Sequence, residues 1–134
     1  MEKYRTRAVA LWILLSAGFA LHCVADVLPI FWSVDVAVDA SAQMPQAMLL
    51  FMMSLSFFVP AVGVLSLLYS DSRWTRTVNL VLAVAVMLFN FVHSAELGTL
   101  ANWGQLAILP LMDVLGVLLV ADSVRLCRAK EEGR

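Results

Sequence analysis

The sequence predicts an all-α integral membrane protein, a four-helix bundle that forms one domain over residues 1–134. The first observation is composition, since 62% of the residues are hydrophobic, 14% are charged and the mean hydropathy is +0.88. A soluble domain carries roughly a quarter charged residues. The second observation is four long apolar stretches. The third is the placement of the basic residues, all of which lie between or beyond those stretches.

The four apolar stretches cover about residues 8–32, 47–69, 77–97 and 106–124. Each is close to or longer than the ~20 residues that a helix needs to cross ~30 Å of hydrocarbon. Their apolar runs are continuous, which favours helices over the alternating strands of a membrane barrel. We therefore expect four transmembrane helices and no separate soluble domain.

The charge distribution predicts the orientation of the spans. All nine basic residues fall in three polar segments, which are Lys3, Arg5 and Arg7; Arg73 and Arg76; and Arg125, Arg128, Lys130 and Arg134. With four spans these segments share one side, and the longer loop of the other side carries only Asp35 and Asp39. The positive-inside rule then places both termini in the cytoplasm. The sequence shows no other basic patch, so it predicts no nucleic-acid partner.

Span one ends near Pro29, and its Gly18, His22 and Asp26 recur every four residues, which places them on one stripe. Trp12 is expected at the inner membrane boundary with Trp74, and Trp32 at the outer one with Trp103. Cys23 and Cys127 are expected near opposite faces, too far apart to pair. The loop over residues 33–46 is interpreted as a short interfacial segment.

Span two carries Ser56, Pro60 and Gly63 along the side that also holds several methionines. Small residues of this kind let a neighbouring helix approach closely. Pro60 lacks a backbone donor, so we expect a kink there. In span three, Asn79 is interpreted as a hydrogen bond between helices. In span four, Asp122 is expected to reach the inner boundary beside Arg125.

Polar side chains of three spans lie at matching depths. His22 lies roughly 21 Å along span one, His93 roughly 22 Å along span three, and Asp113 roughly 10 Å into span four from the outer side. Asp26, Asn90 and Glu96 lie close to them in the sequence. Short loops make spans one and three diagonal neighbours, so we expect the six side chains to form an intramembrane polar pocket in the outer half of the bilayer.

Several functions fit such a pocket. His22, Asp26, His93, Glu96 and Asp113 are the nitrogen and oxygen donors that a divalent metal such as Zn, Fe or Mn takes. The same groups, with Asn90, would suit the binding of a small-molecule ligand, or proton-linked transport of one. They would also suit an acid–base enzyme acting on lipid, or a purely structural subunit. The sequence leaves these alternatives open, as it does enzymatic activity and self-association.

Short apolar motifs suggest a family. They are Ala25-Asp26-Val27, Val59-Pro60 with Leu65-Ser66-Leu67-Leu68, and Arg73-Trp74 with Asn79. In these the chain resembles small four-span bacterial membrane proteins of uncharacterised function, loosely DoxX-like. The resemblance implies a four-helix bundle in the bacterial inner membrane. It implies no reaction and no site residues, and His22 and His93 lie outside its pattern.

Overall fold

The computed structural model describes residues 1–36, 45–95 and 103–129 and confirms the all-α prediction. The elements in order are α1 (Glu2–Val27), the 3₁₀ helix η1 (Leu28–Trp32), α2 (Gln46–Met53), the π-helical η2 (Ser54–Phe58), α3 (Val59–Tyr69), α4 (Arg73–Ser94) and α5 (Gln105–Arg128). In these ranges, four continuous helical stretches are long and apolar enough to cross a membrane. Residues 37–44, most of the outer loop, lie outside the described residues.

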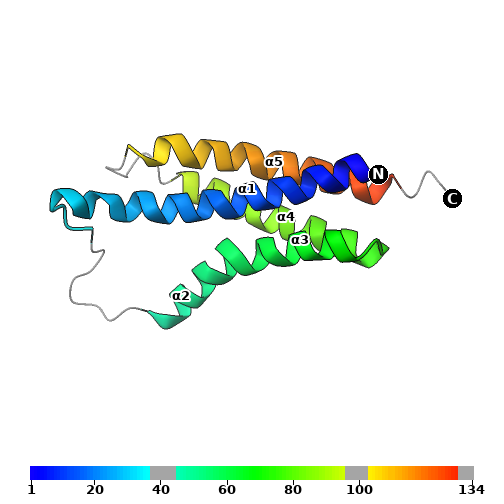
Figure 1. Cartoon of the computed structure of the whole chain (residues 1–134), viewed down its shortest axis with the longest axis horizontal. Helices are drawn as coiled ribbons and strands as arrows, with labels where there is room; N and C mark the ends of the chain where they lie inside the picture. The colour runs from blue at the N-terminus through cyan, green and yellow to red at the C-terminus, as the bar shows by residue number, and fades with distance from the viewer. Residues whose placement is uncertain (37–44, 96–102, 130–134) are drawn as a thin grey trace.

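The helices pack in the expected order around the bundle (Figure 1). α5 packs along both α1 and α4, and α3 contacts the same two helices on the other side. α1 and α4 are therefore diagonal neighbours. The N-terminus and the end of α5 lie at one end of the bundle, and α2 diverges from the other helices (Figure 1). No residue of α2 is buried.

The core places Trp12 differently from the expectation. Its side chain is fully buried, and its indole Nε1 donates a hydrogen bond to Asn79 Oδ1 at 3.3 Å. The prediction of a boundary position was wrong because the indole fits against Gly63 of α3, which has no side chain to exclude it. The other three tryptophans are largely exposed, which is consistent with boundary positions; they are Trp32, Trp74 and Trp103.

Asn79 joins all four spans, which confirms its interpretation as a link between helices. Its Oδ1 accepts from Trp12 of α1 at 3.3 Å and from the hydroxyl of Ser123 of α5 at 3.4 Å. Its Nδ2 donates to the carbonyl of Gly63 at 3.0 Å and to the hydroxyl of Ser66 at 3.3 Å, both in α3. The amide is almost completely buried, so each hydrogen bond replaces one that water would otherwise make.

The irregularity expected at Pro60 takes the form of a π-helical segment directly before it. Because proline has no N–H, the carbonyl of Ser56 lacks its usual partner four residues along the chain. The hydroxyl of Ser16 in α1 donates to that carbonyl at 3.3 Å. The wide π turn and the missing hydrogen bond together bend the helical stretch, so the axis of α2 points away from that of α3.

The expectation for Asp122 was half wrong. Its side chain is fully buried and does not reach the boundary. It pairs with Arg125 Nη1 at 3.0 Å, as predicted, and also with Arg7 Nε of α1 at 3.0 Å. A buried carboxylate requires such compensation. Asp122 therefore faces α1 instead of the surface, because the Arg7 guanidinium of α1 provides a second positive charge for the carboxylate.

Candidate functional site

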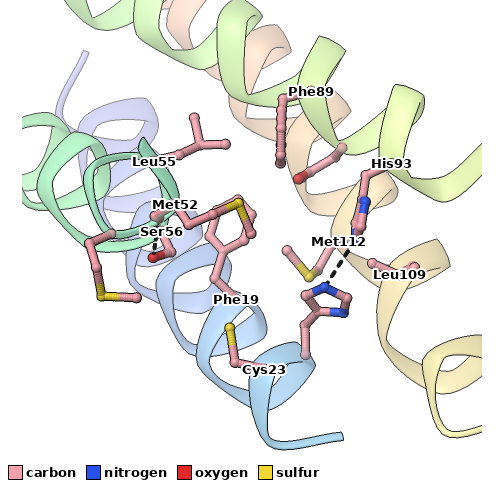
Figure 2. A pocket seen from close by; sticks show the side chains of 12 residues that line it. Phe19, Cys23, Met52, Leu55, Ser56, Phe89, His93, Leu109 and Met112 are labelled. Carbon is pink, nitrogen blue, oxygen red and sulfur yellow. Dashed lines mark hydrogen bonds between the residues drawn. The ribbon is translucent and has the colours of Figure 1, made fainter. Parts of the chain in front are cut away.

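Two histidines from diagonally opposite helices meet at the end of the bundle away from the termini. His22 Nε2 of α1 and His93 Nε2 of α4 are 2.9 Å apart, and their rings lie edge to face with centroids 4.8 Å apart (Figure 2). Only 5% of His22 is exposed. This contact confirms the expectation that His22 and His93 approach one another across the bundle.

Gln105, the first residue of α5, holds His22 in place. Its Oε1 lies 2.7 Å from His22 Nδ1, and its Nε2 donates to the His22 carbonyl at 3.3 Å and to Asp26 Oδ1. Asp26 Oδ2 in turn lies 3.4 Å from His22 Nε2. Four side chains from three helices therefore form one connected polar cluster, which we call the histidine cluster: His22, Asp26, His93 and Gln105.

The hydrogen-bond network determines where the protons lie. Because the Gln105 amide nitrogen donates to two acceptors, its oxygen is the group that faces His22. Nδ1 of His22 must then carry the hydrogen, and a neutral His22 presents a lone pair at Nε2. His93 Nε2–H donates to that lone pair. If His22 gains a proton, its Nε2 becomes a donor, with Asp26 and a His93 lone pair as its acceptors.

A cavity lies beside the histidine cluster (Figure 2). It has a volume of about 20 Å³, which is room for roughly one water molecule. Its walls come from α1, α2 with η2, α4 and α5, and they are mostly apolar; they include Phe19, Met52, Phe89, Leu109 and Met112. A larger molecule fits only if one of these walls moves outward.

Asn90 supplies the cavity with a polar group that has no partner. The residue is 2% exposed and lines the cavity one turn before His93. Within the described part of the chain, its Nδ2 makes no hydrogen bond, and the same holds for Ser94 Oγ and Asp113 Oδ1. An unpaired buried donor is costly by about 1–3 kcal/mol. The Asn90 amide is therefore available to an acceptor that enters the cavity.

Of the predicted site residues, one described residue stands apart from this arrangement, and another lies outside the described part of the chain. Asp113 is not among the residues that line the cavity, and it makes no contact with the described residues of the histidine cluster. α5 turns Gln105, Leu109 and Met112 toward the cluster and cavity, and Asp113 lies one residue further round the helix. Glu96 lies outside the described residues.

Sequence reasoning missed Gln105. It lies at the start of span four and is not among the predicted site residues, although it stands four residues before Leu109 on the same helical face. A search for asparagine or glutamine one helical turn before the first apolar residue of a buried stripe would have found Gln105. Neutral amides attract less attention than charged groups in an apolar span, yet this one contacts both His22 and Asp26.

The expectation of a divalent metal gains no support from this geometry. Among the described residues, no group of three or more His, Cys, Asp or Glu side chains is arranged to hold a metal ion. The physical reason is that the two Nε2 atoms face each other in a hydrogen bond instead of facing a common point. Cys23 and Cys127 form no disulfide with each other, as predicted.

Comparisons with protein families, curated proteins and solved structures give no match for this chain. The DoxX-like resemblance stays a prediction. The fold and the site themselves define a chain of four long apolar helices that encloses a hydrogen-bonded histidine pair next to a small, largely apolar cavity.

Proposed function

We propose that this is a multi-pass protein of the bacterial inner membrane that binds a small molecule in the outer half of the bilayer, with both termini in the cytoplasm. Binding is coupled to the proton of the histidine pair. The observation that supports this most is the contact of 2.9 Å between the Nε2 atoms of His22 and His93. A contact of that kind holds one proton, because two protonated rings would place two N–H donors face to face.

The chemistry of the cavity indicates the class of ligand. The walls favour an apolar body, and the unpaired Asn90 Nδ2 favours one hydrogen-bond acceptor such as a carbonyl oxygen. Asp26 stands 3.4 Å from His22 Nε2 and compensates a positive charge on that ring. A ligand that disturbs the histidine pair therefore changes the proton count of the cluster. Transport of the ligand with a proton would use the same steps.

A divalent metal remains the competing ligand for these side chains, and metal analysis of the purified protein separates the two. Zinc, iron or manganese near one equivalent per chain would contradict the proton-sharing pair. Its absence, together with a proton-linked ligand, would support the proposal.

Ligand binding should depend on pH through the histidine pair. We would screen small amphiphiles that carry one carbonyl group by thermal melting of the detergent-solubilised protein at pH 5.5 and pH 7.5. A ligand that breaks the contact between the two Nε2 atoms changes how the pair holds its proton, so the affinity of a true ligand should differ between the two pH values. His93→Gln keeps a hydrogen-bonding group but removes one of the two rings that share the proton, and should weaken the pH dependence.

The matched control is Met52→Leu, which changes the cavity wall without a titratable group. It should alter the affinity and leave the pH dependence in place. Equal affinity at both pH values in the unaltered protein, or a pH dependence of the same size in His93→Gln, would contradict coupling through the pair.

The orientation can be tested separately by thiol labelling. In a chain whose own Cys23 and Cys127 are replaced, we expect Asp35→Cys to react with an impermeant reagent added outside the cell. Ser72→Cys should not react, because it precedes α4 on the side that holds the basic residues. Equal labelling at both positions would indicate that the chain inserts in both orientations. The histidine cluster could then no longer be assigned to the outer half of the bilayer.

A further inference from the structure

A second hollow lies beside the candidate site, between α1 and the part of the second span formed by η2 and α3. It has a volume of about 470 Å³. Its lining includes Trp12 and Pro60, which are buried, and Phe57 and Leu65, which are largely exposed. Apart from Ser16, the residues that line it carry apolar or aromatic side chains. We call this space, which is open toward the side of the bundle, the apolar groove.

The apolar groove and the cavity of the candidate site meet at one hydrogen bond. The hydroxyl of Ser16, which lines the groove, donates at 3.3 Å to the carbonyl of Ser56, which lines the cavity. On α1, the consecutive residues Phe19 and Ala20 line the cavity and the groove respectively. The two spaces are therefore adjacent, and the contact between Ser16 and Ser56 separates them.

The two spaces differ in size and in chemistry. The cavity has room for roughly one water molecule, yet it contains the histidine pair and the unpaired Nδ2 of Asn90. The groove is far larger, and its one hydroxyl already donates to Ser56. A molecule with a small polar end and a long apolar body fits the two spaces together better than it fits either one alone.

The groove runs in the direction of a lipid chain. On α1 it extends from Ala20 back to Trp12, and Trp12 lies about 15 Å along the helix axis from His22. In the proposed orientation this direction leads away from the outer surface, as the chains of outer-leaflet lipids do. An extended carbon chain advances about 1.25 Å per bond, so roughly twelve carbons cover this distance.

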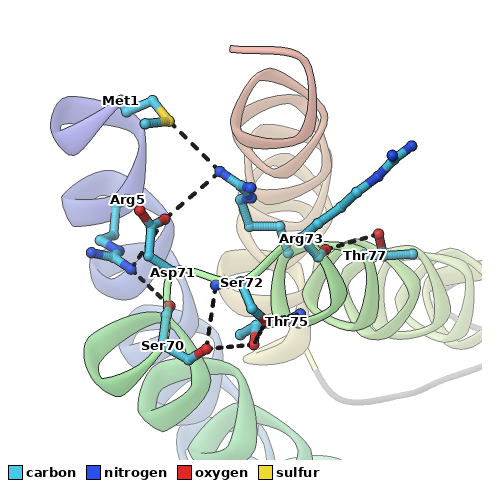
Figure 3. A network of polar contacts seen from close by, with 9 residues as sticks. Met1, Arg5, Ser70, Asp71, Ser72, Arg73, Thr75 and Thr77 are labelled. Carbon is cyan, nitrogen blue, oxygen red and sulfur yellow. Dashed lines mark hydrogen bonds and ion pairs between the residues drawn. The ribbon is translucent and has the colours of Figure 1, made fainter. Parts of the chain in front are cut away.

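The second span is attached to α1 differently at its two ends. At the inner end, Arg5 Nη2 of α1 donates to the Ser70 carbonyl at 2.7 Å and lies 3.5 Å from Asp71 Oδ1 (Figure 3). Among the described residues, the contact of Ser16 with Ser56 is the one side-chain hydrogen bond that joins α2 and η2 to another helix. α2 can therefore move outward at the π-helical turn while α3, the other wall of the groove, stays in place.

We propose that the apolar groove binds the chain of the ligand whose polar end occupies the cavity. The ligand is then a single-chain, lipid-like carbonyl compound. This inference rests on the proposed function and adds the class of ligand. Asn90 Nδ2 donates to the carbonyl oxygen, and the chain passes between Ser16 and Ser56, which separate to admit it. A phospholipid does not fit in this way, because its charged head group is too bulky for a small, mostly apolar cavity.

The first test locates the chain by photolabelling of the full-length protein in phosphatidylcholine vesicles. One probe is a methyl ketone with a diazirine near the far end of a straight chain of roughly twelve carbons. The other is the alkane with the same diazirine and no carbonyl. We expect the ketone to label α1 near Ile13 and α3 near Leu65, both of which line the groove. It should do so roughly fivefold more than the alkane, as expected for one hydrogen bond.

Two results of the labelling would overturn the proposal. Labelling of all four spans in proportion to their exposure would show that the chain has no preferred place on the protein. Equal labelling of the groove by the ketone and the alkane would show that the groove holds only bulk hydrocarbon.

The second test compares octan-2-one with hexadecan-2-one by thermal melting in detergent. Ala17→Phe fills part of the groove and leaves the cavity intact, because Ala17 lines only the groove. It should weaken the binding of hexadecan-2-one roughly fivefold, through lost packing contacts, and leave octan-2-one unchanged. Ala107→Phe is the matched control, because Ala107 is exposed on α5 and lines neither space. The detergent takes up each ketone equally with either variant, so the comparison cancels partitioning.

Equal losses for the two ketones, or for the two variants, would overturn the role of the groove. A melting shift that depends on pH but not on Ala17→Phe would contradict this inference alone. A shift that depends on Ala17→Phe but not on pH would support the groove and contradict only the proton coupling of the proposed function. Melting temperatures without ketone identify a variant that has lost its fold, and Ala17→Leu then replaces Ala17→Phe, with an expected intermediate loss.

Discussion

Replacing Gly63 with leucine should prevent the bundle from folding. A Cβ atom at this position would lie 2.6 Å from Trp12 Nε1 and closer still to another atom of the same ring. The indole is fully buried and hydrogen-bonded to Asn79, so the ring cannot shift to make room for the new side chain. Even Gly63→Ala should destabilise the protein by roughly 2–3 kcal/mol, the upper part of the range for overpacked cores. Unfolding in detergent would measure the loss.

Two other glycines serve as graded controls. A Cβ at Gly18 would meet Met112 Cγ at 2.9 Å, but that side chain is flexible and can shift. A Cβ at Gly116 would lie 3.4 Å from Met87, close to ordinary contact. We expect Gly18→Ala to cost less than Gly63→Ala, and Gly116→Ala to be close to neutral. Equal losses at all three sites would show that the close approach to Trp12 is not what requires glycine.

Asn79→Leu should give the second largest loss of stability. It removes hydrogen bonds to three helices and leaves the buried Trp12 N–H without an acceptor. Such bonds between membrane helices average about 0.6 kcal/mol each, and an unsatisfied buried donor costs about 1–3 kcal/mol. The expected loss is therefore roughly 2–4 kcal/mol in the free energy of unfolding, measured in the same detergent.

Ser123→Ala is the control for Asn79→Leu. It removes only the longest contact of the amide, at 3.4 Å, and should cost well under 1 kcal/mol. A loss as large as that of Asn79→Leu would mean that the amide does not act as the common partner of the four helices.

The parts of the fold that depend on length and apolar composition could be predicted from the sequence. Four spans, the diagonal relation of α1 and α4, and the approach of His22 to His93 all follow from hydrophobic run lengths, short connections and a rise of 1.5 Å per residue. Asn79 and Pro60 were also interpreted correctly, because an amide and a proline in an apolar span each have few structural options.

The errors arose where rotation about the helix axis decides the outcome. Trp12 and Asp122 were placed by depth alone, and depth does not tell whether a side chain faces a partner or lipid. Asp113 and Gln105 differ in the same way, since both belong to α5 and only one faces His22. The π-helical turn at Ser54–Phe58 also rotates the residues before it relative to those after it. A regular helical wheel therefore does not show which side chains of the second span share a face.

The exposure of α2 has a consequence for how a ligand would be supplied. α2 and η2 form one wall of the cavity, yet no residue of either is buried, and among the described residues a single side-chain hydrogen bond, from Ser16 to the Ser56 carbonyl, joins this wall to another helix. Within a bilayer, the easiest wall to displace therefore faces hydrocarbon. A ligand would arrive by lateral diffusion, and its effective concentration would be set by its oil–water partition coefficient. Occupancy would then follow the lipid content of a preparation as much as the amount of compound added to the water.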